Sequence, residues 1–347
     1  MTRKECSVLR GIAILCIILH NYCHWIPFAV HENEFSFNLE YYFNFWNSIQ
    51  CNTLFIQFFS FWGHLGVPVF VMLSGYGLVL KYDNSTINKT SFIHKHYKKL
   101  CIPMIGGLVF YYIIQYIINY SGHFDVTSII PVKKFIAQIT LIINLLPHPQ
   151  RLIHPGPYWY FSMTMQLYII YLFLVYKQPT KYITIIAISL FIFSCFLKQH
   201  QQILIWTKYN AIGWFLPFAY GVILGRTNNR SSTYQASILS VFIIILIPIF
   251  GFTYITWLLI PLFIALAANN FVTFLPKCLI YFFNIIGEKS LFIFVLHPIA
   301  RELTIRYGAT CPYLGIILYI ILTFLLVYII MIISKLTTQS RQRNISE

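Results

Sequence analysis

Two kinds of ionisable side chain lie in the first apolar segment of the chain. Arg10 is near the start of this segment, and His20 and His24 are near its end. At the usual rise of a helix, Arg10 and His20 are about 15 Å apart along the axis and cannot touch. Because ionisable groups in lipid are costly, both are expected to face the interior of a bundle. An imidazole there can act as a base near neutral pH, while the arginine binds another part of one long ligand.

The other histidines and the few carboxylates restrict which reactions the chain could carry out. His20 has an alternative role as a structural residue bonded to a neighbouring helix, and His24, one turn later, competes for the role of base. Of only nine aspartates and glutamates, Glu288 alone falls in an apolar segment, which leaves a cation-coupled transporter few carboxylates to use. His94 and His96 lie in a basic loop that is a poor zinc site, so we expect no metal site.

The composition requires that these residues sit in a membrane. Hydrophobic residues make up 58% of the 347 positions and charged residues 10%, which is too apolar for a soluble protein. We predict an all-α fold, in which a single domain over residues 1–347 is a bundle of about ten transmembrane helices. The expected spans are residues 11–25, 54–80, 101–120, 158–176, 182–197, 210–225, 237–252, 254–268, 290–300 and 313–333.

The distribution of charge predicts the orientation. An even number of spans puts both termini on one side, and a cytoplasmic N-terminus puts most of the 24 lysines and arginines inside. The net charge of +15 then reflects this rule and not nucleic-acid binding. We therefore expect a multi-pass membrane protein with both termini in the cytoplasm, in contact with membrane lipid.

Two long loops and the cysteines complete the organisation. Residues 31–53 and 121–157 are expected to face the exterior as a lid or acceptor-binding rim, and residues 134–146 within the second predict an interfacial or re-entrant helix. The eight cysteines show no C-x-x-C spacing and are interpreted as packing residues.

Four motifs in order resemble those of a known family, the acyltransferase-3 integral membrane acyltransferases, over nearly the whole chain. They are Arg10-Gly11-Ile12-Ala13 followed by His20, the Gly66–Tyr76 segment, Trp159 followed by Gln166 and Tyr168, and Ser290-Leu291 through Leu296-His297-Pro298. Relatives usually space the arginine and histidine by eleven residues, where this chain has Asn21. It also has Thr164 and Met165 where many relatives carry a glutamate pair. The choice between His20 and His24 as the base stays open.

The resemblance implies transfer of an acyl group, with acetyl expected, from acyl-CoA to a hydroxyl of a surface polysaccharide or lipid-linked glycan. No tightly bound cofactor is expected, and acetyl-CoA is the donor substrate. His20, Arg10 and Ser74 are the expected catalytic residues, and a continuous cavity is expected to join Arg10 to His20. The expected donor-binding residues are Arg10, Lys95, Lys98 and Lys99, although the lysine run is also typical of ordinary positive-inside anchoring.

The expected substrate-binding residues are mostly aromatic and polar. They are Asn21, His24, Tyr76, Trp159, Tyr160 and His297, and plain packing is the alternative for the aromatic ones. For Ser74 a bond to a backbone carbonyl is favoured, because Gly75 and Gly77 beside it indicate close helix packing. The alternative function is a glycan flippase or exporter, which should show paired repeats and broken helices; neither is visible in the sequence.

Overall fold

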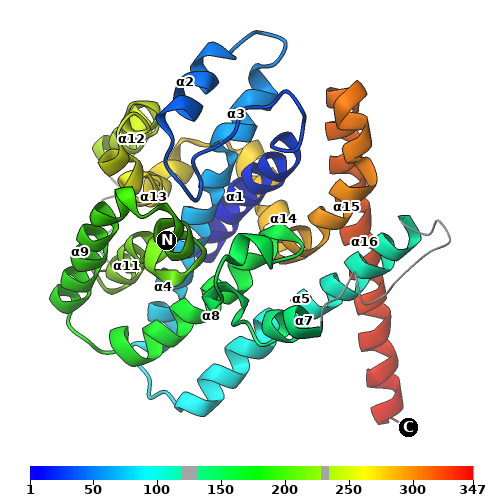
Figure 1. Cartoon of the computed structure of the whole chain (residues 1–347). Helices are drawn as coiled ribbons and strands as arrows, with labels where there is room; N and C mark the ends of the chain where they lie inside the picture. The colour runs from blue at the N-terminus through cyan, green and yellow to red at the C-terminus, as the bar shows by residue number, and fades with distance from the viewer. Residues whose placement is uncertain (119–131, 228–233, 347) are drawn as a thin grey trace.

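The computed structural model describes residues 1–118, 132–227 and 234–346, and these residues form helices and no strands. The prediction of an all-α bundle is confirmed (Figure 1). The helices are α1 (Arg3–Cys23), α2 (Leu39–Asn47), α3 (Leu54–Trp62), α4 (Gly66–Tyr82), α5 (Lys89–Ile118), α7 (Val132–Ile139), α8 (Trp159–Ile170), α9 (Thr180–Phe196), α10 (Gln201–Tyr209), α11 (Ala211–Thr227), α12 (Tyr234–Phe250), α13 (Tyr254–Phe271), α14 (Lys277–Glu288), α15 (Ser290–Thr310) and α16 (Pro312–Ser346).

Seven helical segments in the described part of the chain are long and apolar enough to cross a membrane, and α14 with α15 forms an eighth if this pair, bent by 74°, is one span. The seven are Arg3–Cys23, Leu54–Tyr82, Lys89–Ile118, Gly156–Val175, Thr180–Gln199, Tyr254–Phe274 and Pro312–Lys335. The other two expected spans correspond to α11 and α12, of 17 residues each, which is the lower limit for a span.

The α1 helix is the element against which the site is built. Thr2 caps its first turn through a reciprocal pair of hydrogen bonds with Glu5, which satisfies two amides that the helix cannot bond internally. Along its length α1 packs against α3, α4, α14 and α15 (Figure 1). These neighbours bury most of its residues and leave His20 in its last turn.

Close backbone contact joins α4 to α11. A Cβ atom on Gly75 would lie 2.4 Å from the carbonyl oxygen of Phe218, and one on Gly221 would lie 2.0 Å from that of Met72. Small residues at such a crossing let membrane helices pack tightly. The packing role predicted for Gly75 is therefore confirmed, whereas the one predicted for Gly77 is wrong, because nothing lies within 4 Å of a Cβ placed there.

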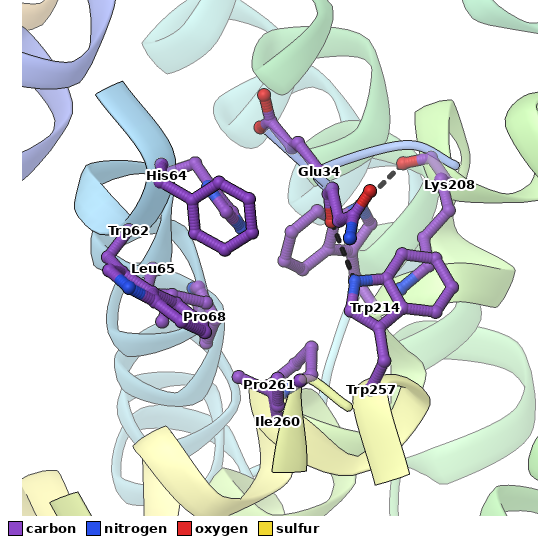
Figure 2. A pocket seen from close by; sticks show the side chains of 13 residues that line it. Glu34, Trp62, His64, Leu65, Pro68, Lys208, Trp214, Trp257, Ile260 and Pro261 are labelled. Atoms are coloured by element: carbon purple, nitrogen blue, oxygen red, sulfur yellow. Dashed lines mark hydrogen bonds between the residues drawn. The ribbon is translucent and has the colours of Figure 1, made fainter. Parts of the chain in front are cut away.

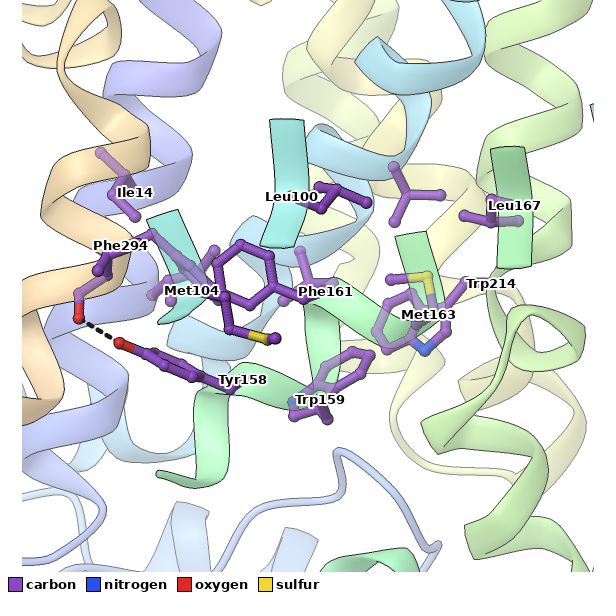
Figure 3. Packing of buried hydrophobic residues seen from close by; sticks show 14 of the residues in the cluster. Ile14, Leu100, Met104, Tyr158, Trp159, Phe161, Met163, Leu167, Trp214 and Phe294 are labelled. Carbon is purple, nitrogen blue, oxygen red and sulfur yellow. Dashed lines mark hydrogen bonds between the residues drawn. The ribbon is translucent and has the colours of Figure 1, made fainter. Parts of the chain in front are cut away.

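A buried apolar cluster fills the space between α1, α5, α8 and α15. Ile14, Met104, Tyr158, Phe161 and Phe294 belong to it (Figure 3). The hydroxyl of Tyr158 donates to the carbonyl oxygen of Val295 at 2.7 Å, so this buried polar atom is satisfied. The cluster holds α15 in place beside α1.

The segment between α1 and α2 folds back over the end of α1. Backbone groups of Val30 bond the side chains of Gln57 and Ser60 on α3 at 2.9 and 2.7 Å. The indole of Trp257 on α13 donates to the carbonyl oxygen of Asn33 at 2.7 Å. These bonds anchor the segment at both ends, so its side chains take fixed positions.

The two long loops contain more structure than the sequence predicted. Residues 31–53 were expected to be a loop but include α2, a nine-residue helix whose N-cap is the side chain of Asn38. The short helix predicted within 134–146 is present as α7, which begins earlier, at Val132. Residues 121–131 of the second loop lie outside the described residues.

Candidate active site

A cavity of about 620 Å³ lies where the end of α1 meets the returning segment, α8 and α15. It is partly open to the surroundings, and its lining mixes aromatic and titratable side chains. His20, His24, Glu32 and Glu34 line one part, Arg301, Glu302, His154 and Tyr111 another, and Phe35, Trp159, Tyr160, Tyr209 and Trp25 supply aromatic surface. A concave site of this size with a few convergent polar groups can hold a small organic ligand.

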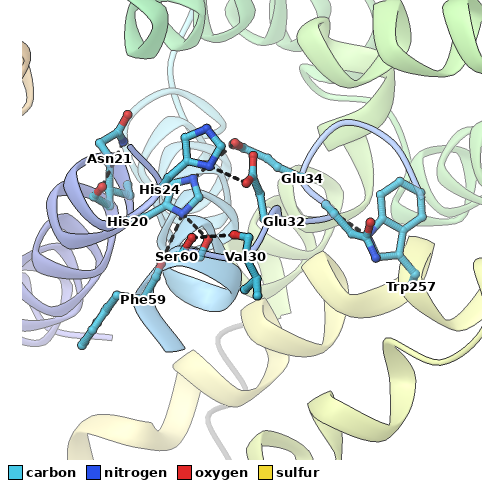
Figure 4. A network of polar contacts seen from close by, with 11 residues as sticks. His20, Asn21, His24, Val30, Glu32, Glu34, Phe59, Ser60 and Trp257 are labelled. Atoms are coloured by element: carbon cyan, nitrogen blue, oxygen red, sulfur yellow. Dashed lines mark hydrogen bonds and ion pairs between the residues drawn. The ribbon is translucent and has the colours of Figure 1, made fainter. Parts of the chain in front are cut away.

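His20 is held in a defined tautomer. Its Nδ1 atom lies 3.0 Å from the carbonyl oxygen of Ser60 and 3.2 Å from that of Phe59 (Figure 4). Carbonyl oxygens only accept hydrogen bonds, so Nδ1 carries the proton of the neutral ring. The lone pair is then on Nε2, which lies 3.7 Å from Oε2 of Glu34. A buried imidazole in this state can accept a proton from a ligand in the cavity.

Two glutamates of the returning segment face the two histidines. Oε2 of Glu32 lies 2.6 Å from Nδ1 of His24, and the rings of His20 and His24 stack with centroids 5.6 Å apart (Figure 4). Burial raises the pKa of Glu32, but the contact with His24 and the positive charges of both histidines outweigh it and bring the pKa to about 2. Burial also raises the pKa of Glu34, and there its effect exceeds the opposing effect of His20.

A small second cavity shares Glu34 and His64 with the first (Figure 2). Lys208 of α10 lines it, with its Nζ atom 4.3 Å from the centroid of the Trp257 ring. Burial lowers the pKa of Lys208 to about 8, while the negative charge of Glu34 acts in the opposite direction. This cation is held beside the catalytic candidates by an aromatic ring, an arrangement in which the ring face partly replaces water.

Three groups in the main cavity are close enough to share one metal ion. Nε2 of His20 and carboxylate oxygens of Glu32 and Glu34 lie within 4.8 Å of one another. One imidazole and two carboxylates are ligands that divalent transition metals accept.

The α15 side of the cavity carries a partly buried ion pair. Nη2 of Arg301 donates to Oε1 of Glu302 at 3.0 Å, and the Gln115 side chain donates to Oε2 of the same carboxylate at 3.0 Å. The guanidinium carbon of Arg301 lies 4.9 Å from the centroid of the Trp25 ring. Planar aromatic surface beside paired donors and acceptors suits a polyhydroxylated ligand.

The structure brings together five of the twelve residues that the sequence singled out. His20, Asn21, His24, Trp159 and Tyr160 all line the main cavity. Arg10, Ser74, Tyr76 and His297 are not among its lining residues. The lining also does not include Lys95, Lys98 or Lys99. On the α1 side the lining extends only to Ile17, so this cavity does not join Arg10 to His20.

Two of the expected substrate-binding residues have other partners. The hydroxyl of Tyr76 bonds both the amino group and the carbonyl oxygen of Met1, at 2.7 and 2.9 Å, so it fastens the start of the chain to α4. His297 is fully buried, and its Nδ1 lies 3.3 Å from the carbonyl oxygen of Ile293 within α15. Both geometries match structural roles.

Ser74 lies between the cavity and the lysine run. Its hydroxyl donates to the carbonyl oxygen of Phe70 at 2.9 Å, as the interpretation of a backbone-bonded serine predicted. Side chains of Tyr160 and Tyr168 lie beside it, and the ring of Tyr168 is 4.5 Å from that of His96. A line of buried and half-buried polar side chains thus leads from the cavity wall to α5.

The cations predicted to bind the donor are partly gathered in space. Arg10 and Lys95, together with Lys81, lie close enough to Lys99 to repel its charge. Lys98 is exposed and is not among the charges that act on Lys99. Three of the four predicted donor-binding residues therefore share one positively charged region.

The sequence did not single out Glu32, Glu34, Lys208 or Arg301 as site residues. The sequence signal for these four residues was weak. Glu32 and Glu34 lie in a segment that was expected to form an exterior rim, and Lys208 and Arg301 were interpreted as cations that flank the membrane spans. Their positions depend on how the segment after α1 folds and on contacts between helices far apart in the chain.

Comparison with known proteins identifies the family. A family model described as an acyltransferase domain matches residues 4–335. No curated protein and no solved structure matches the chain. The matched range contains all four sequence motifs and every residue of the cavity. The chain therefore belongs to the acyltransferase-3 family of integral membrane acyltransferases.

Proposed function

We propose that this membrane acyltransferase moves an acetyl group from acetyl-CoA to a hydroxyl of a surface polysaccharide or lipid-linked glycan, in a bacterial inner membrane with both termini inside. The observation that carries the proposal is the position of His20: its Nδ1–H is fixed by backbone carbonyls, and its Nε2 lone pair is beside Glu34 in the wall of a cavity of about 620 Å³. Acyl transfer to a hydroxyl requires such a base.

In the proposed reaction Nε2 of His20 takes the proton of the acceptor hydroxyl as its oxygen attacks the thioester carbonyl carbon. The carbon–sulfur bond then breaks, and the proton returns from His20 to the departing thiolate. Glu34, 3.7 Å away, stabilises the imidazolium in between. Burial raises the pKa of Glu34, and the neighbouring His20 opposes that shift.

His20 is preferred to His24 as the base because of their partners. Nδ1 of His24 is engaged by Glu32 at 2.6 Å, and its ring stacks on that of His20. In the proposal, the Glu32 carboxylate stabilises the positive charge that develops on His20, and His24 contacts the acceptor. Asn21, whose amide donates to the carbonyl oxygen of Ile17 at 2.9 Å, contributes its oxygen to the same acceptor site.

The donor is assigned to the region between the cations and the cavity. Arg10, Lys95 and Lys99 would hold the phosphates of CoA, since clustered cations bind phosphate oxygens through charged hydrogen bonds. The buried and half-buried polar side chains around Ser74 would lie along the pantetheine arm. An arm crossing this region would bring its thioester to Tyr160, which lines the cavity with His20.

The acceptor is assigned to the α15 side of the cavity. Arg301, Glu302 and His154 offer donors and acceptors for sugar hydroxyls, and Trp25 and Trp159 offer flat apolar faces. A sugar placed between these walls would present a hydroxyl to His20.

The test compares His20→Gln and His24→Gln with the wild type at matched membrane abundance. Purified protein is incubated with acetyl-CoA and a glycan fraction, and release of CoA and formation of acetyl ester are both measured. We expect His20→Gln to lower ester formation by about 100-fold or more and His24→Gln to lower it less. If the reverse order is found, His24 is the base.

A cellular experiment separates the transferase from the exporter. Ester content of surface glycan is measured by mass spectrometry in a deletion strain carrying wild type or His20→Gln. Loss of esters with glycan still at the surface supports the transferase. Glycan that reaches the surface only when either protein is present, with no change in esters, would reject it.

A further inference from the structure

The cluster that holds the base also has the composition of a metal site. Nε2 of His20 and one oxygen from each of Glu32 and Glu34 lie within 4.8 Å of one another. They come from α1 and from the segment anchored to α3 and α13. The three atoms are therefore held by fixed backbone and not by mobile surface side chains.

We propose that His20, Glu32 and Glu34 bind one divalent transition metal ion, with zinc the best match, and that this ion reversibly blocks the acyltransferase. The mixed nitrogen and oxygen ligands favour zinc over calcium or magnesium, which prefer oxygen alone. Bound zinc would coordinate the Nε2 lone pair of His20 and remove the base from the reaction. Metal binding does not depend on the proposed function, whereas the inhibition rests on it.

The surroundings of His20 match those of a metal-bound histidine. Its Nδ1–H donates to the carbonyl oxygens of Ser60 and Phe59, which fixes the ring and directs Nε2 away from the backbone. A hydrogen bond of this kind on the second ring nitrogen orients histidine ligands and raises their basicity. His20 thus needs no rearrangement of its ring to become a ligand.

One buried polar atom without a hydrogen bond points to the same place. Nδ1 of His64 is buried and makes no hydrogen bond, whereas Oε2 of Glu32 and Nδ1 of His24 pair with each other at 2.6 Å. The His64 side chain is 8% exposed, lines the main cavity, and its ring lies 5.4 Å from that of His20. Buried polar atoms are otherwise almost always bonded, so the unbonded Nδ1 of His64 gives this cluster one further nitrogen that could contact a cation.

The protein also leaves room for the ion to enter and for a fourth ligand. All three ligand residues line the open main cavity, so one coordination position would face the cavity and not protein. Zinc sites with three protein ligands keep such a position for water or substrate. An acceptor sugar and the ion would then compete for the same space.

Binding is tested on the purified full chain in detergent, without acyl donor or acceptor. Cys51, Cys278 and Cys311, which are exposed, are first changed to serine so that thiols do not bind zinc. Zn²⁺ is titrated in competition with a chromophoric chelator. We expect one equivalent per chain, and about tenfold or greater loss of affinity in Glu32→Gln and in Glu34→Gln. Equal affinity in the parent and both variants overturns the proposal.

Glu302→Gln is the matched control for the binding experiment. Glu302 is a carboxylate of the same cavity but is bonded to Arg301 and Gln115, so its replacement should leave zinc affinity unchanged. If Glu302→Gln weakens binding as much as Glu32→Gln, the ion is held elsewhere in the cavity. Retained thermal unfolding temperatures separate loss of a ligand from loss of the fold.

Inhibition is measured as acetyl ester formation at increasing Zn²⁺. We expect activity to fall over the concentration range in which the site fills and to recover when a chelator is added. Co²⁺, which accepts the same ligands, should act likewise, and Mg²⁺ should not. Stoichiometric zinc binding without inhibition overturns the inhibitory role. Absence of any acyltransferase activity instead points to failure of the proposed function, because binding is measured separately.

Discussion

Gly63 lies directly against His20. A Cβ atom on Gly63 would be 2.7 Å from the Cβ of His20 and 2.8 Å from the carbonyl oxygen of Cys16. Gly63 begins the short 3-10 turn η1 (Gly63–Leu65) that joins α3 to α4. The backbone that accepts the hydrogen bonds of His20 therefore approaches α1 as closely as it does only because residue 63 has no side chain.

Gly63→Ala should consequently inactivate the enzyme without contacting substrate. The added methyl group must push His20 or the turn aside, and a displacement of about 1 Å at a reacting group can cost about 100-fold in rate. Gly77→Ala on α4 is the control, since a Cβ there meets nothing within 4 Å. Ester formation is compared at equal membrane abundance, and near-equal activities of the two variants would contradict the assigned position of His20.

The sequence predicted the parts of the molecule that depend on local pattern. Long apolar segments predict spans because every backbone group in lipid must be bonded within its own helix. Each expected span coincides with helix, although α5 begins earlier and α15 ends later than expected, and α2 and α10 fall outside the expected spans. His20 was found because a histidine in such a segment is unusual. Close packing at Gly75 was predicted because small residues in membrane helices let neighbouring helices approach. Gly77, two residues away, has no such contact.

The carboxylates of the site could not be predicted in this way. Glu32 and Glu34 are placed by the Trp257 indole and by the Gln57 and Ser60 side chains, which are contacts between positions far apart in the chain. Burial of Lys208 against Trp257 depends on packing of the same kind. Periodicity reports which face of one helix is apolar and carries no information on which loop folds over it.

Lys208→Met should make the protein more stable and less active. The pKa of Lys208 is about 8 in the folded chain and about 10.4 when unfolded, so folding opposes its charge. That penalty is fully present below pH 8, and it decreases as the pH rises from 8 toward 10.4, because the unfolded chain then binds more protons. The excess stability of Lys208→Met should therefore shrink over this range.

Thermal unfolding in detergent at pH 7 and pH 9.5 measures this effect. Turnover of Lys208→Met should fall, since the substitution removes the interaction between the Lys208 ammonium and the negative charge of Glu34. A variant that is less stable than the wild type at pH 7 would show that the Lys208 ammonium strengthens the fold.

Asp83→Ala should destabilise the fold and spare the chemistry. Asp83 accepts from Nε of Arg226 at 2.6 Å and from the Tyr171 hydroxyl at 2.7 Å, which ties together the ends of α4, α8 and α11. Removing one partner of a largely buried ion pair costs roughly 3 kcal/mol. Asp83→Asn, which keeps an acceptor, should cost less. Unchanged unfolding temperatures in both variants would refute this role, and ester formation at low temperature should stay near wild type.

The cationic region provides a test of the donor site in which two adjacent lysines serve as variant and control. Both lysines are exposed, but Lys81, Arg10 and Lys95 lie close enough to Lys99 to repel its charge, and Lys98 is not among those cations. Both substitutions, Lys99→Gln and Lys98→Gln, remove one positive charge from the same turn of α5, so a general effect of charge on the membrane surface would change both equally.

Lys99→Gln should raise the KM for acetyl-CoA by about tenfold with little change in kcat, because one hydrogen bond to a charged group contributes roughly 1.5–3 kcal/mol. Lys98→Gln should leave the KM near wild type. With an acetyl-pantetheine donor, which lacks the nucleotide phosphates, the difference between the two variants should disappear. If Lys99→Gln raises the KM for both donors equally, the lysine contacts the thioester arm or supports the fold. Equal effects of both substitutions would instead support ordinary positive-inside anchoring.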